Sequence, residues 1–398
     1  MARRVIILGS TGSIGRAGVD VVRHASALHA QGLLDEPLKV VGLAAGSSAQ
    51  LLQEQARELG VEATALSSGA PGDATFVGAD AAWRLVREVE ADIVLAAMVG
   101  VAGLPAAMEA ARLGRDVALA NKETLVAGGG LMVEACRVSG AKLLPVDSEH
   151  SALWQCLEAV APGFAPPCAS NARTMRSIAR LTLTASGGPF RTWSKERIDA
   201  ATPEEAMKHP TWSMGPKVTI DSAGLVNKAL EVIEAHWLFG LPEDRIDVLV
   251  HPQSIVHGLI ELEDGAVLAH LAGPDMRHPI QHALLWPTRA PGVPSLKRVD
   301  WAKLRSLEFE PPDHGRFPGL SLAWRVLREG GTSGAIFNAA NEAAVARFLA
   351  GGIPFGEIAR TVVRTMDRCA PVAADSLEGV LEADRAAREI ANQIMDGR

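Results

Sequence analysis

Two acidic residues, Asp147 and Glu149, lie two positions apart in the segment PVDSEHSALWQ, directly after the apolar run AKLL. If that run is a strand that continues through them, both side chains point to the same side, where they repel each other unless a cation joins them. Carboxylate oxygens are hard ligands that suit Mg²⁺ or Mn²⁺. The same residues also suit the start of a helix over SALWQCL, because acids are stabilised there. The spacing alone therefore supports a metal site and a helix start equally.

A third carboxylate that could complete a metal site is Glu231. It falls in DSAGLVNKALEVIE, where Asn227, Lys228 and Glu231 share one face of a predicted helix. An Mg²⁺ ion usually takes only some of its oxygen ligands from protein and the rest from water and substrate. The alternative for Lys228 and Glu231 is an ordinary surface ion pair, which this segment on its own would favour.

Two further segments indicate a small-phosphate site. TASGGPF contains Ser186, and VTIDSAGLVNK contains Ser222, Asn227 and Lys228. Hydroxyl, amide and ammonium groups donate hydrogen bonds to phosphate oxygens, and glycines leave the backbone accessible. Each residue alone is ordinary, but together they suit a phosphorylated substrate.

A glycine-rich turn is expected in ILGSTGSIGRAG, where Gly9, Gly12 and Gly15 join a predicted strand to a predicted helix. Glycines at such a junction let the backbone approach a pyrophosphate, and the helix N-terminus adds partial positive charge. The spacing is G-x-x-G-x-x-G, a variant of the dinucleotide-binding pattern. A plain tight turn is the weaker alternative, because a strand precedes these glycines and a helix follows them.

The end of the second predicted strand, LKVVGLAAG, indicates which dinucleotide binds. An Asp or Glu there would hold the ribose 2′-hydroxyl of NAD, and this chain has Ser47 and Ser48 instead. Serine hydroxyls can donate to a 2′-phosphate, although no Arg or Lys is present to strengthen the contact. The sequence therefore favours NADP over NAD.

Lys122, in LANKETL, follows another predicted strand at the edge where parallel sheets bind ligands. A cation at the N-terminus of a helix opposes the helix dipole. We therefore favour a ligand-binding role for Lys122 over that of a solvated lysine.

The segment TPEEAMKHPTWSMGPK is polar, is interrupted by prolines and contains His209, Trp212 and Met214. Large apolar side chains in such a segment suit a lid that closes over a ligand and expels water. We expect a mobile loop here. His251 and His257, on either side of PQSIV, are expected to be structural.

These residues must be positioned by an α/β fold. Apolar runs alternate with helical patterns over residues 1–150, which predicts a Rossmann-like parallel sheet covered by helices. Residues 151–286 read as a mixed α+β domain with a hairpin at Asp264 and Gly265. The proline-rich residues 287–318 read as a linker, and residues 319–398 as a helical bundle.

Composition excludes several classes of function. The net charge of the 398-residue chain is -7, which argues against nucleic acid as the main partner but permits a small anionic ligand. The cysteines Cys136, Cys156, Cys168 and Cys369 show no disulfide or zinc spacing, which is typical of a cytoplasmic protein. We see no signal-peptide pattern and no apolar run long enough to span a membrane.

Eight segments occur in an order that resembles the 1-deoxy-D-xylulose 5-phosphate reductoisomerase family of the non-mevalonate isoprenoid pathway. They are GSTGSIG, LANKE, LLPVDSEH, SGGPFR, HPTWSMG, DSAGLVNKALEVIEA, HPQSIVH and NAANE. LLPVDSEH together with HPTWSMG is the most specific pair. The helical C-terminal region also fits this family.

The resemblance implies an NADPH- and metal-dependent enzyme that acts as a homodimer. It would convert 1-deoxy-D-xylulose 5-phosphate to 2-C-methyl-D-erythritol 4-phosphate with Mg²⁺ or Mn²⁺, or Co²⁺ as a further option. It implies a catalytic domain over residues 151–286 with a lid at about residues 204–216.

The same resemblance implies roles for individual residues. The metal ligands would be Asp147, Glu149 and Glu231, and the catalytic group would comprise these with Lys122 and His209. The substrate-binding residues would be Lys122, Ser148, Glu149, Ser186, His209, Trp212, Met214, Ser222, Asn227, Lys228 and Glu231. The cofactor-binding residues would be Thr11, Gly12, Ser13, Ile14, Gly46, Asn121, Glu123 and Gly215, to which Ser47 and Ser48 are added from the strand-end argument.

The chain departs from the family pattern at three places. Ser47 stands where the family often has a basic residue, which puts the strength of NADPH binding in question, and Ala185 replaces a common glycine. Residues 166–177 form a longer connection than usual. Two other functions remain open: a semialdehyde dehydrogenase-like enzyme, which would need a nucleophilic cysteine, and a non-catalytic NADP(H)-sensing protein.

Overall fold

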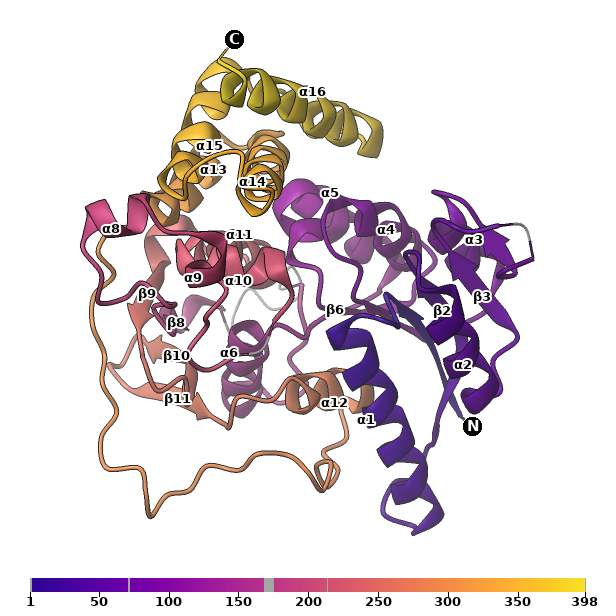
Figure 1. The fold of residues 1–398 in the computed structure, drawn as a ribbon. Coiled ribbons are helices and arrows are strands. Elements are labelled where there is room, and N and C mark those ends of the chain that lie inside the picture. The colour runs from indigo at the N-terminus through magenta and orange to yellow at the C-terminus, as the bar shows by residue number, and fades with distance from the viewer. Residues whose placement is uncertain (1, 71, 168–174, 213, 398) are drawn as a thin grey trace. The chain divides into compact units, whose positions relative to one another are not determined.

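The structure is a computed structural model that describes residues 2–70, 72–167, 175–212 and 214–397 (Figure 1). It divides into two compact units. The first comprises residues 1–124, 132–170 and 275–297, and the second comprises residues 125–131, 171–274 and 298–398. Among the described residues, no helix is both long and apolar enough to cross a membrane.

The first unit is built on a seven-stranded sheet in the order β4-β3-β2-β1-β5-β6-β7, and every pairing is parallel. A parallel sheet is covered on both faces, so its strands are apolar throughout; Val5, Ile6, Ile7 and Leu8 are all 0% exposed. The strands are β1 (Arg3–Leu8), β2 (Leu38–Ala45), β3 (Ala63–Leu66), β4 (Phe76–Val77), β5 (Ile93–Ala96), β6 (Asp116–Leu119) and β7 (Leu143–Pro145).

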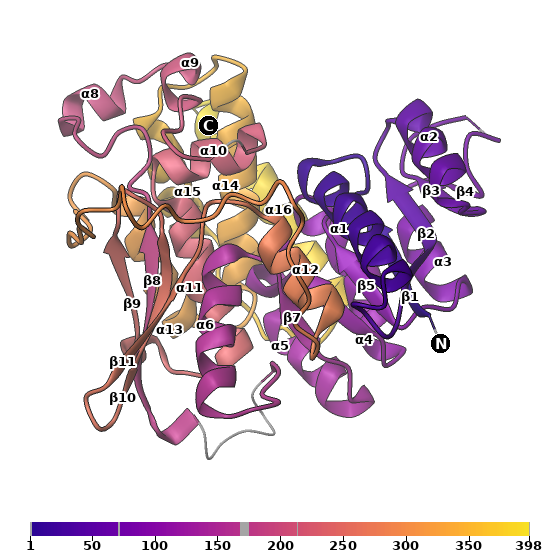
Figure 2. The same cartoon turned by 90° about the horizontal axis from the view of Figure 1, so that it is seen from below.

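Helices cover both faces of this sheet. α1 contacts β1 and β2 and lies beside α12, whereas α3 and α4 contact each other and the strands from the opposite face (Figures 1 and 2). The chain returns to this unit at α12 after forming much of the second unit. The helices are α1 (Ser13–Ala30), α2 (Ala49–Leu59), α3 (Ala81–Glu88), η1 (Val101–Gly103), α4 (Leu104–Arg112), α5 (Lys122–Ser139), α6 (Ser148–Val160) and α12 (Arg277–Leu285). Residues Leu125–Leu131 of α5 fall in the second unit.

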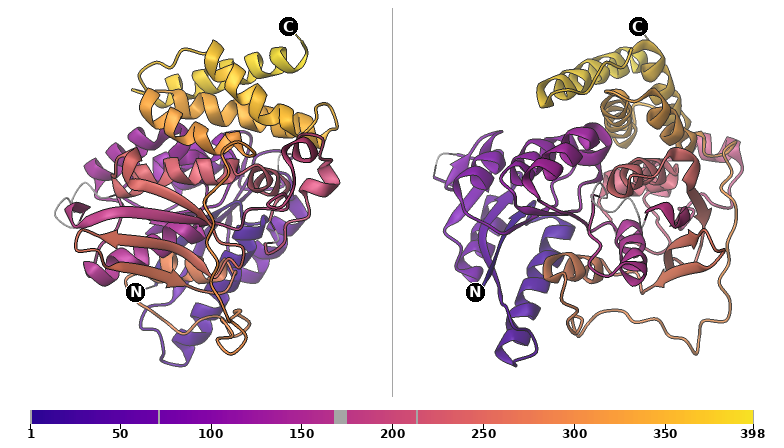
Figure 3. Two further views of the ribbon diagram at one scale, coloured as in Figure 1. Left: turned by 90° about the vertical axis from the view of Figure 1, so that its left-hand side faces the viewer. Right: turned by 180° about the vertical axis from the view of Figure 1, so that it is seen from behind.

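The second unit contains a four-stranded mixed sheet in the order β11-β10-β8-β9, visible in the left view of Figure 3. β10 pairs antiparallel with β11 and β8, and β8 pairs parallel with β9. α11 contacts β8 and β9. The strands are β8 (Ile178–Ala185), β9 (Ile246–Val250), β10 (Val256–Leu262) and β11 (Val267–Leu271); the helices of this part are α8 (Lys195–Asp199), α9 (Pro203–Ala206), α10 (Pro216–Ala223), α11 (Val226–Phe239) and η3 (Glu243–Arg245).

The C-terminal part of the second unit is helical. α14 contacts α15 and α16, and its face toward them is buried, with Phe337 at 0% and Phe348 at 1% exposure. These elements are η4 (Pro318–Ser321), α13 (Leu322–Glu329), α14 (Ser333–Leu349), α15 (Gly356–Arg368) and α16 (Leu377–Met395).

The expected element types are largely confirmed. Strands alternate with helices up to β7, the C-terminal region is helical, and Gly265 turns the β10–β11 hairpin with φ +85°. The expectation of a loop throughout TPEEAMKHPTWSMGPK is wrong at both ends. α9 forms because Thr202 and Glu205 make a reciprocal capping box, and α10 begins at Pro216, where proline has a helical φ and needs no hydrogen-bond partner.

Candidate active site

Asp147 and Glu149 lie at the start of a helix rather than on a strand. β7 ends at Pro145, Asp147 is the N-cap of α6 and Glu149 lies in the first turn. The expectation that the strand continues through both acids is therefore wrong, and the helix-start interpretation is confirmed. A carboxylate oxygen of Asp147 still lies within 4.8 Å of one of Glu149, because residues at the cap and in the first turn surround the same helix end. A helix start and a metal site are therefore compatible here.

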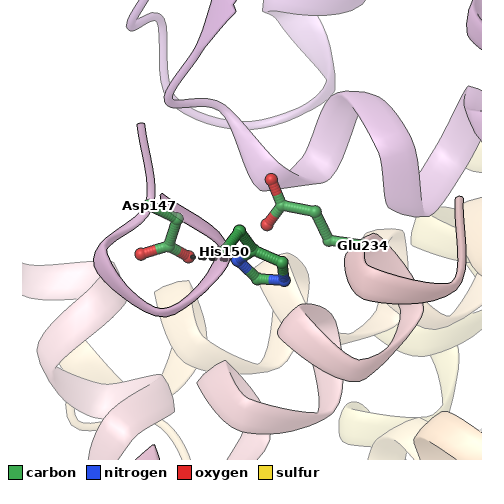
Figure 4. A group of neighbouring side chains, drawn as sticks. All are labelled: Asp147, His150 and Glu234. Carbon is green, nitrogen blue, oxygen red and sulfur yellow. Dashed lines mark ion pairs between the residues drawn. The ribbon is translucent and has the colours of Figure 1, made fainter. Parts of the chain in front are cut away.

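Two basic side chains, Lys122 and His150, also lie close to Asp147. Lys122 Nζ lies 2.6 Å from Asp147 Oδ2. The nearest ring nitrogen of His150 lies 3.8 Å from the same oxygen, and Figure 4 shows this pair. Lys122 is the first residue of α5, which begins shortly after β6, and is only 8% exposed. The unfavourable position of this cation at a helix N-terminus is thus offset by its ion pair with Asp147.

Two further hydrogen bonds order the same region. Ser148 Oγ donates to Glu149 Oε2 at 2.6 Å. The side chain of Asn121 caps α5 by accepting from the Thr124 backbone N–H at 3.1 Å. Lys122 therefore lies at the start of α5, which Asn121 caps, and Glu149 lies at the start of α6, which Asp147 caps.

The glycine-rich turn has the geometry that the spacing predicts. Gly9 follows β1 with φ +79°, and a Cβ there would lie 2.4 Å from the Ala97 carbonyl oxygen. A Cβ on Gly15 would lie 2.2 Å from the Gly9 carbonyl oxygen. Only glycine fits these two close approaches. Gly12, the exposed N-cap of α1, leaves the backbone open between them.

The end of β2 is open to solvent. β2 ends at Ala45, and Gly46, Ser47 and Ser48 are exposed. Ser48 is the N-cap of α2, but its side chain makes no capping hydrogen bond. Hydroxyl groups and a helix N-terminus therefore lie together at this strand end, as an anion-binding position requires.

The loop after β8 and the end of α10 are brought together in the second unit. The Gly188 backbone N–H donates to Ser186 Oγ at 3.1 Å. A Cβ on Gly188 would lie 2.7 Å from the Ser222 carbonyl oxygen, so a larger residue would push the two segments apart. Ser186 and Ser222 thus occupy neighbouring segments, as a shared phosphate site would need.

The first turns of α11 hold a buried charge cluster. Asn227 Nδ2 and Lys228 Nζ both donate to Glu231, and Lys228 and Glu231 are 3% and 1% exposed. The surface ion pair considered from the sequence is therefore wrong, because the chain buries both groups. Burying an ion pair costs desolvation energy that the pairing often does not recover. The pair of Lys228 and Glu231 is therefore expected to add little net stability.

His209 is hydrogen-bonded to Ser186, in the loop after β8. His209 Nδ1 accepts from the backbone N–H of Trp212 at 2.9 Å, so the proton lies on Nε2, which donates to Ser186 Oγ at 3.0 Å. Burial lowers the pKa of His209 below its usual value. The Trp212 and His257 rings are 6.1 Å apart. The neutral imidazole therefore links the segment that contains Trp212 and Met214 to the Ser186 loop.

His251, His257, Cys136 and Cys156 lack features of a catalytic group. Ring nitrogens of His251 and His257 contact the backbone carbonyls of Glu308 at 2.8 Å and Ala272 at 3.2 Å, which agrees with structural roles. Burial raises the pKa of Cys136 to about 12 and that of Cys156 to about 11. A nucleophilic cysteine needs the opposite shift, so a semialdehyde dehydrogenase-like mechanism is not favoured. Cys168 and most of the 166–177 connection lie outside the described residues.

The sequence did not point to Asp221 and Asn341. Asp221 is 1% exposed and accepts from Asn341 Nδ2 of α14 at 2.8 Å, while Lys217 Nζ lies 2.9 Å away. Asp221 directly precedes Ser222. NAANE contains Asn341, but no local pattern reveals a partner so far away along the chain.

Comparisons with known proteins match this chain to one enzyme family. A family model described as 1-deoxy-D-xylulose 5-phosphate reductoisomerase matches residues 5–129, and models of C-terminal domains of the same enzyme match residues 143–239 and 271–390. The reductoisomerase of Leifsonia xyli subsp. xyli is 47% identical over 393 residues, covering 99% of both chains. That of Protochlamydia amoebophila is 43% identical, covering 97% of both chains.

Solved structures show the same relationship. The reductoisomerase from Zymomonas mobilis in complex with NADPH is 39% identical, with a TM-score of 0.86 over 99% of both chains. A DOX-P reductoisomerase in complex with NADPH, fosmidomycin and magnesium is 35% identical, with a TM-score of 0.89 over 99% of this chain and 98% of that one. The present chain therefore belongs to the 1-deoxy-D-xylulose 5-phosphate reductoisomerase family.

Proposed function

We propose that this protein converts 1-deoxy-D-xylulose 5-phosphate to 2-C-methyl-D-erythritol 4-phosphate. One carbon–carbon bond of the substrate breaks and another forms to give a branched aldehyde, which then takes a hydride from NADPH and a proton to become an alcohol. The observation that carries this proposal is the full-length match to reductoisomerases, 47% identical in one case. The buried polar clusters of both units supply the groups that such a reaction needs.

We propose Asp147, Glu149 and Glu231 as ligands of a divalent metal ion, Mg²⁺ or Mn²⁺. Two observations support the fit: the Asp147 and Glu149 oxygens lie within 4.8 Å of each other, and all three residues offer only hard oxygen ligands. When bound, the metal supplies Lewis-acid polarisation of the substrate carbonyl and a hydroxyl. A solved relative holds magnesium together with NADPH and fosmidomycin.

The substrate phosphate is proposed to bind at Ser186, Ser222, Asn227 and Lys228. Ser186 Oγ already accepts from His209 Nε2 and the Gly188 N–H, so its own hydrogen can point at a phosphate oxygen. Lys228 supplies positive charge in a desolvated place, where it acts most strongly. Lys122 and Ser148 are proposed to contact the reacting end of the substrate, as are Glu149 and Glu231. Lys122 and His209 complete the proposed catalytic group.

NADPH is proposed to bind along the carboxyl edge of the parallel sheet. The Gly9–Gly15 turn is proposed to bind the pyrophosphate through its backbone, and the exposed Ser47 and Ser48 are proposed to donate to the 2′-phosphate. The remaining proposed contacts are Thr11, Gly12, Ser13, Ile14, Gly46, Asn121, Glu123 and Gly215. Asn121 and Glu123 are largely buried beside Lys122, which supports a position close to the reacting end of the cofactor.

Residues 204–216, with Trp212 and Met214, are proposed to act as a lid over the substrate. We propose a functional division into NADPH-binding residues 1–150, catalytic residues 151–286, linker residues 287–318 and helical residues 319–398. We further propose a homodimer, by analogy with the family, and a cytoplasmic location, because the cysteines are sparse and unpatterned.

The decisive experiment follows NADPH oxidation with 1-deoxy-D-xylulose 5-phosphate, with and without Mg²⁺ or Mn²⁺, and with NADH in place of NADPH. Metal-dependent oxidation of NADPH supports the proposal. Oxidation of NADH at an equal rate would show that Ser47 and Ser48 do not select the 2′-phosphate. A folded protein that binds NADPH but oxidises none of it would refute the enzymatic function and favour a sensing role.

A further inference from the structure

The second unit contains a cavity of about 250 Å³ between α8, the α10–α11 turn, η4 and α15. This volume is close to the lower end of the range for small-molecule sites, about 300 Å³. None of its lining residues belongs to the metal, substrate or cofactor sets proposed above. Its apolar walls are formed mainly by Ile198, Ile220, Val226, Phe355 and Ile358.

More basic than acidic residues line the cavity, although Asp313 pairs with Arg316 and Glu357 with Arg360 from outside the lining. Four cationic residues and two acidic ones line it; the cations are Lys195, Arg316, Arg360 and Arg364, and the acids are Asp199 and Asp221. The acids are already engaged: Asp221 by Lys217 at 2.9 Å, and Asp199 by Arg360 at 3.3 Å and Lys195 at 3.5 Å.

Arg364 is the least committed of the cations. Its closest acidic partner is Glu357, at 3.8 Å, and its side chain is 55% exposed. Arg360, on the same helix, is 42% exposed and pairs with Glu357 at 2.7 Å and with Asp199 at 3.3 Å. Glu357 therefore lies beside both guanidinium groups but is hydrogen-bonded only to that of Arg360, so the N–H groups of Arg364 can hold an anion that shares Arg360 with Glu357. The rim of the cavity therefore favours an anion, while its walls favour an apolar group.

We propose that this cavity is an effector site for a small amphiphilic anion, with a short aliphatic chain against the apolar walls and a phosphate or carboxylate at Arg360 and Arg364. Ile220, Asp221 and Gly224 line the cavity on either side of Ser222. A bound anion therefore changes the KM for the phosphorylated substrate. This coupling rests on the proposed function, whereas the binding itself does not.

The first test measures binding of hexyl phosphate, hexanoate and hexanol to the full-length protein by isothermal titration calorimetry. We expect one or both anions to bind at least about tenfold more tightly than hexanol, since a charge-assisted hydrogen bond contributes on the order of a factor of ten. The tighter of the two anions identifies the head group. Equal binding of hexanol, or no binding of either anion, would overturn the proposal.

Matched variants locate the site. Arg364→Gln should weaken anion binding about tenfold, whereas Arg385→Gln, at a 71% exposed arginine of α16 outside the cavity, should not. Ala359→Leu fills the cavity and should abolish binding; Ala386→Leu, at an exposed position of α16, should leave it intact. Thermal denaturation checks that each variant is folded. Undiminished binding to folded Ala359→Leu would place the anion elsewhere and refute the site.

The coupling is tested by steady-state kinetics with increasing concentrations of the anion that binds. We expect the KM for 1-deoxy-D-xylulose 5-phosphate to change in the unaltered protein and in Arg385→Gln but not in Ala359→Leu. Calorimetric binding with an unchanged KM in an active enzyme would overturn the effector role. If no turnover is found at all, the proposed function fails, and calorimetry still decides whether the cavity binds the anion.

Discussion

Replacing Asn341 by leucine tests whether the helical C-terminal part positions the phosphate-binding residues. Asn341 is fully buried on α14 and donates to Asp221 at 2.8 Å. Asp221 directly precedes Ser222 on α10. Leucine has a similar size but no donor, so Asn341→Leu removes one hydrogen bond from a buried carboxylate without opening a large cavity.

The loss of stability in Asn341→Leu depends on the contacts that Asp221 keeps. A hydrogen bond to a charged group contributes about 1.5–3 kcal/mol. Lys217 still lies 2.9 Å from Asp221, so the loss should stay below the roughly 3–5 kcal/mol of an isolated buried charge. If about 1 kcal/mol of this loss affects the placement of Ser222, the KM for substrate rises about fivefold.

The assay combines urea unfolding with steady-state kinetics, and Asn338→Leu is the control. Asn338 is equally buried on the same helix, but it donates to Glu342 of that helix at 2.9 Å. We expect both variants to lose stability and only Asn341→Leu to raise KM, with kcat nearly unchanged. An unchanged KM in Asn341→Leu, or an equal rise in Asn338→Leu, would refute the positioning role.

Four further predictions concern the proposed site. Glu149→Gln should abolish turnover even at saturating Mg²⁺, because it removes a metal charge at constant size; near-normal activity in the NADPH assay would contradict the metal role. Lys228→Ala should raise the KM for substrate more than it lowers kcat, and the reverse pattern would assign Lys228 to the transition state. Gly15→Ala places a Cβ 2.2 Å from the Gly9 carbonyl oxygen and should weaken NADPH binding, measured by fluorescence titration, while unaltered affinity would argue against the turn as the cofactor site. Burial lowers the pKa of His209, so the stability that His209 contributes is present above its usual pKa of 6.5 and is lost as pH falls through the lowered pKa. His209→Gln should therefore reduce the pH dependence of the unfolding free energy between pH 6.5 and that lowered pKa, and an unchanged pH dependence would show that His209 does not cause it.

Much of the fold could be predicted from sequence because the signals are local. The alternation of apolar runs and helical patterns predicts the parallel sheet, since each strand of a covered sheet is apolar by itself. Gly9 and Gly15 predict the turn after β1, and Gly240 ends α11 with φ +63°, because only nearby backbone atoms decide those conformations. Capping signals are local in the same way, as the capping box of Thr202 and Glu205 at the start of α9 shows.

The site could be predicted only in part. Residue types identified the acids, serines and Lys228 as candidates, and the resemblance to a family, not the spacing, favoured a metal over a helix cap at Asp147 and Glu149. Tertiary structure decided that both acids start a helix and that Lys228 and Glu231 are buried. Burial of a helix face depends on which segments cover it, and one helix contains no information about that.

The sequence by itself determined the kinds of element, the glycine turn and the chemical types available to a site. Only the tertiary structure decided that Lys122 pairs with Asp147, that Gly188 packs on Ser222 and that Asn341 holds Asp221. Each of these contacts joins segments that are well separated along the chain. Their formation depends on how the loops bring distant segments together. Hydrophobic periodicity reports only on side chains within a few turns of one helix or a few residues of one strand.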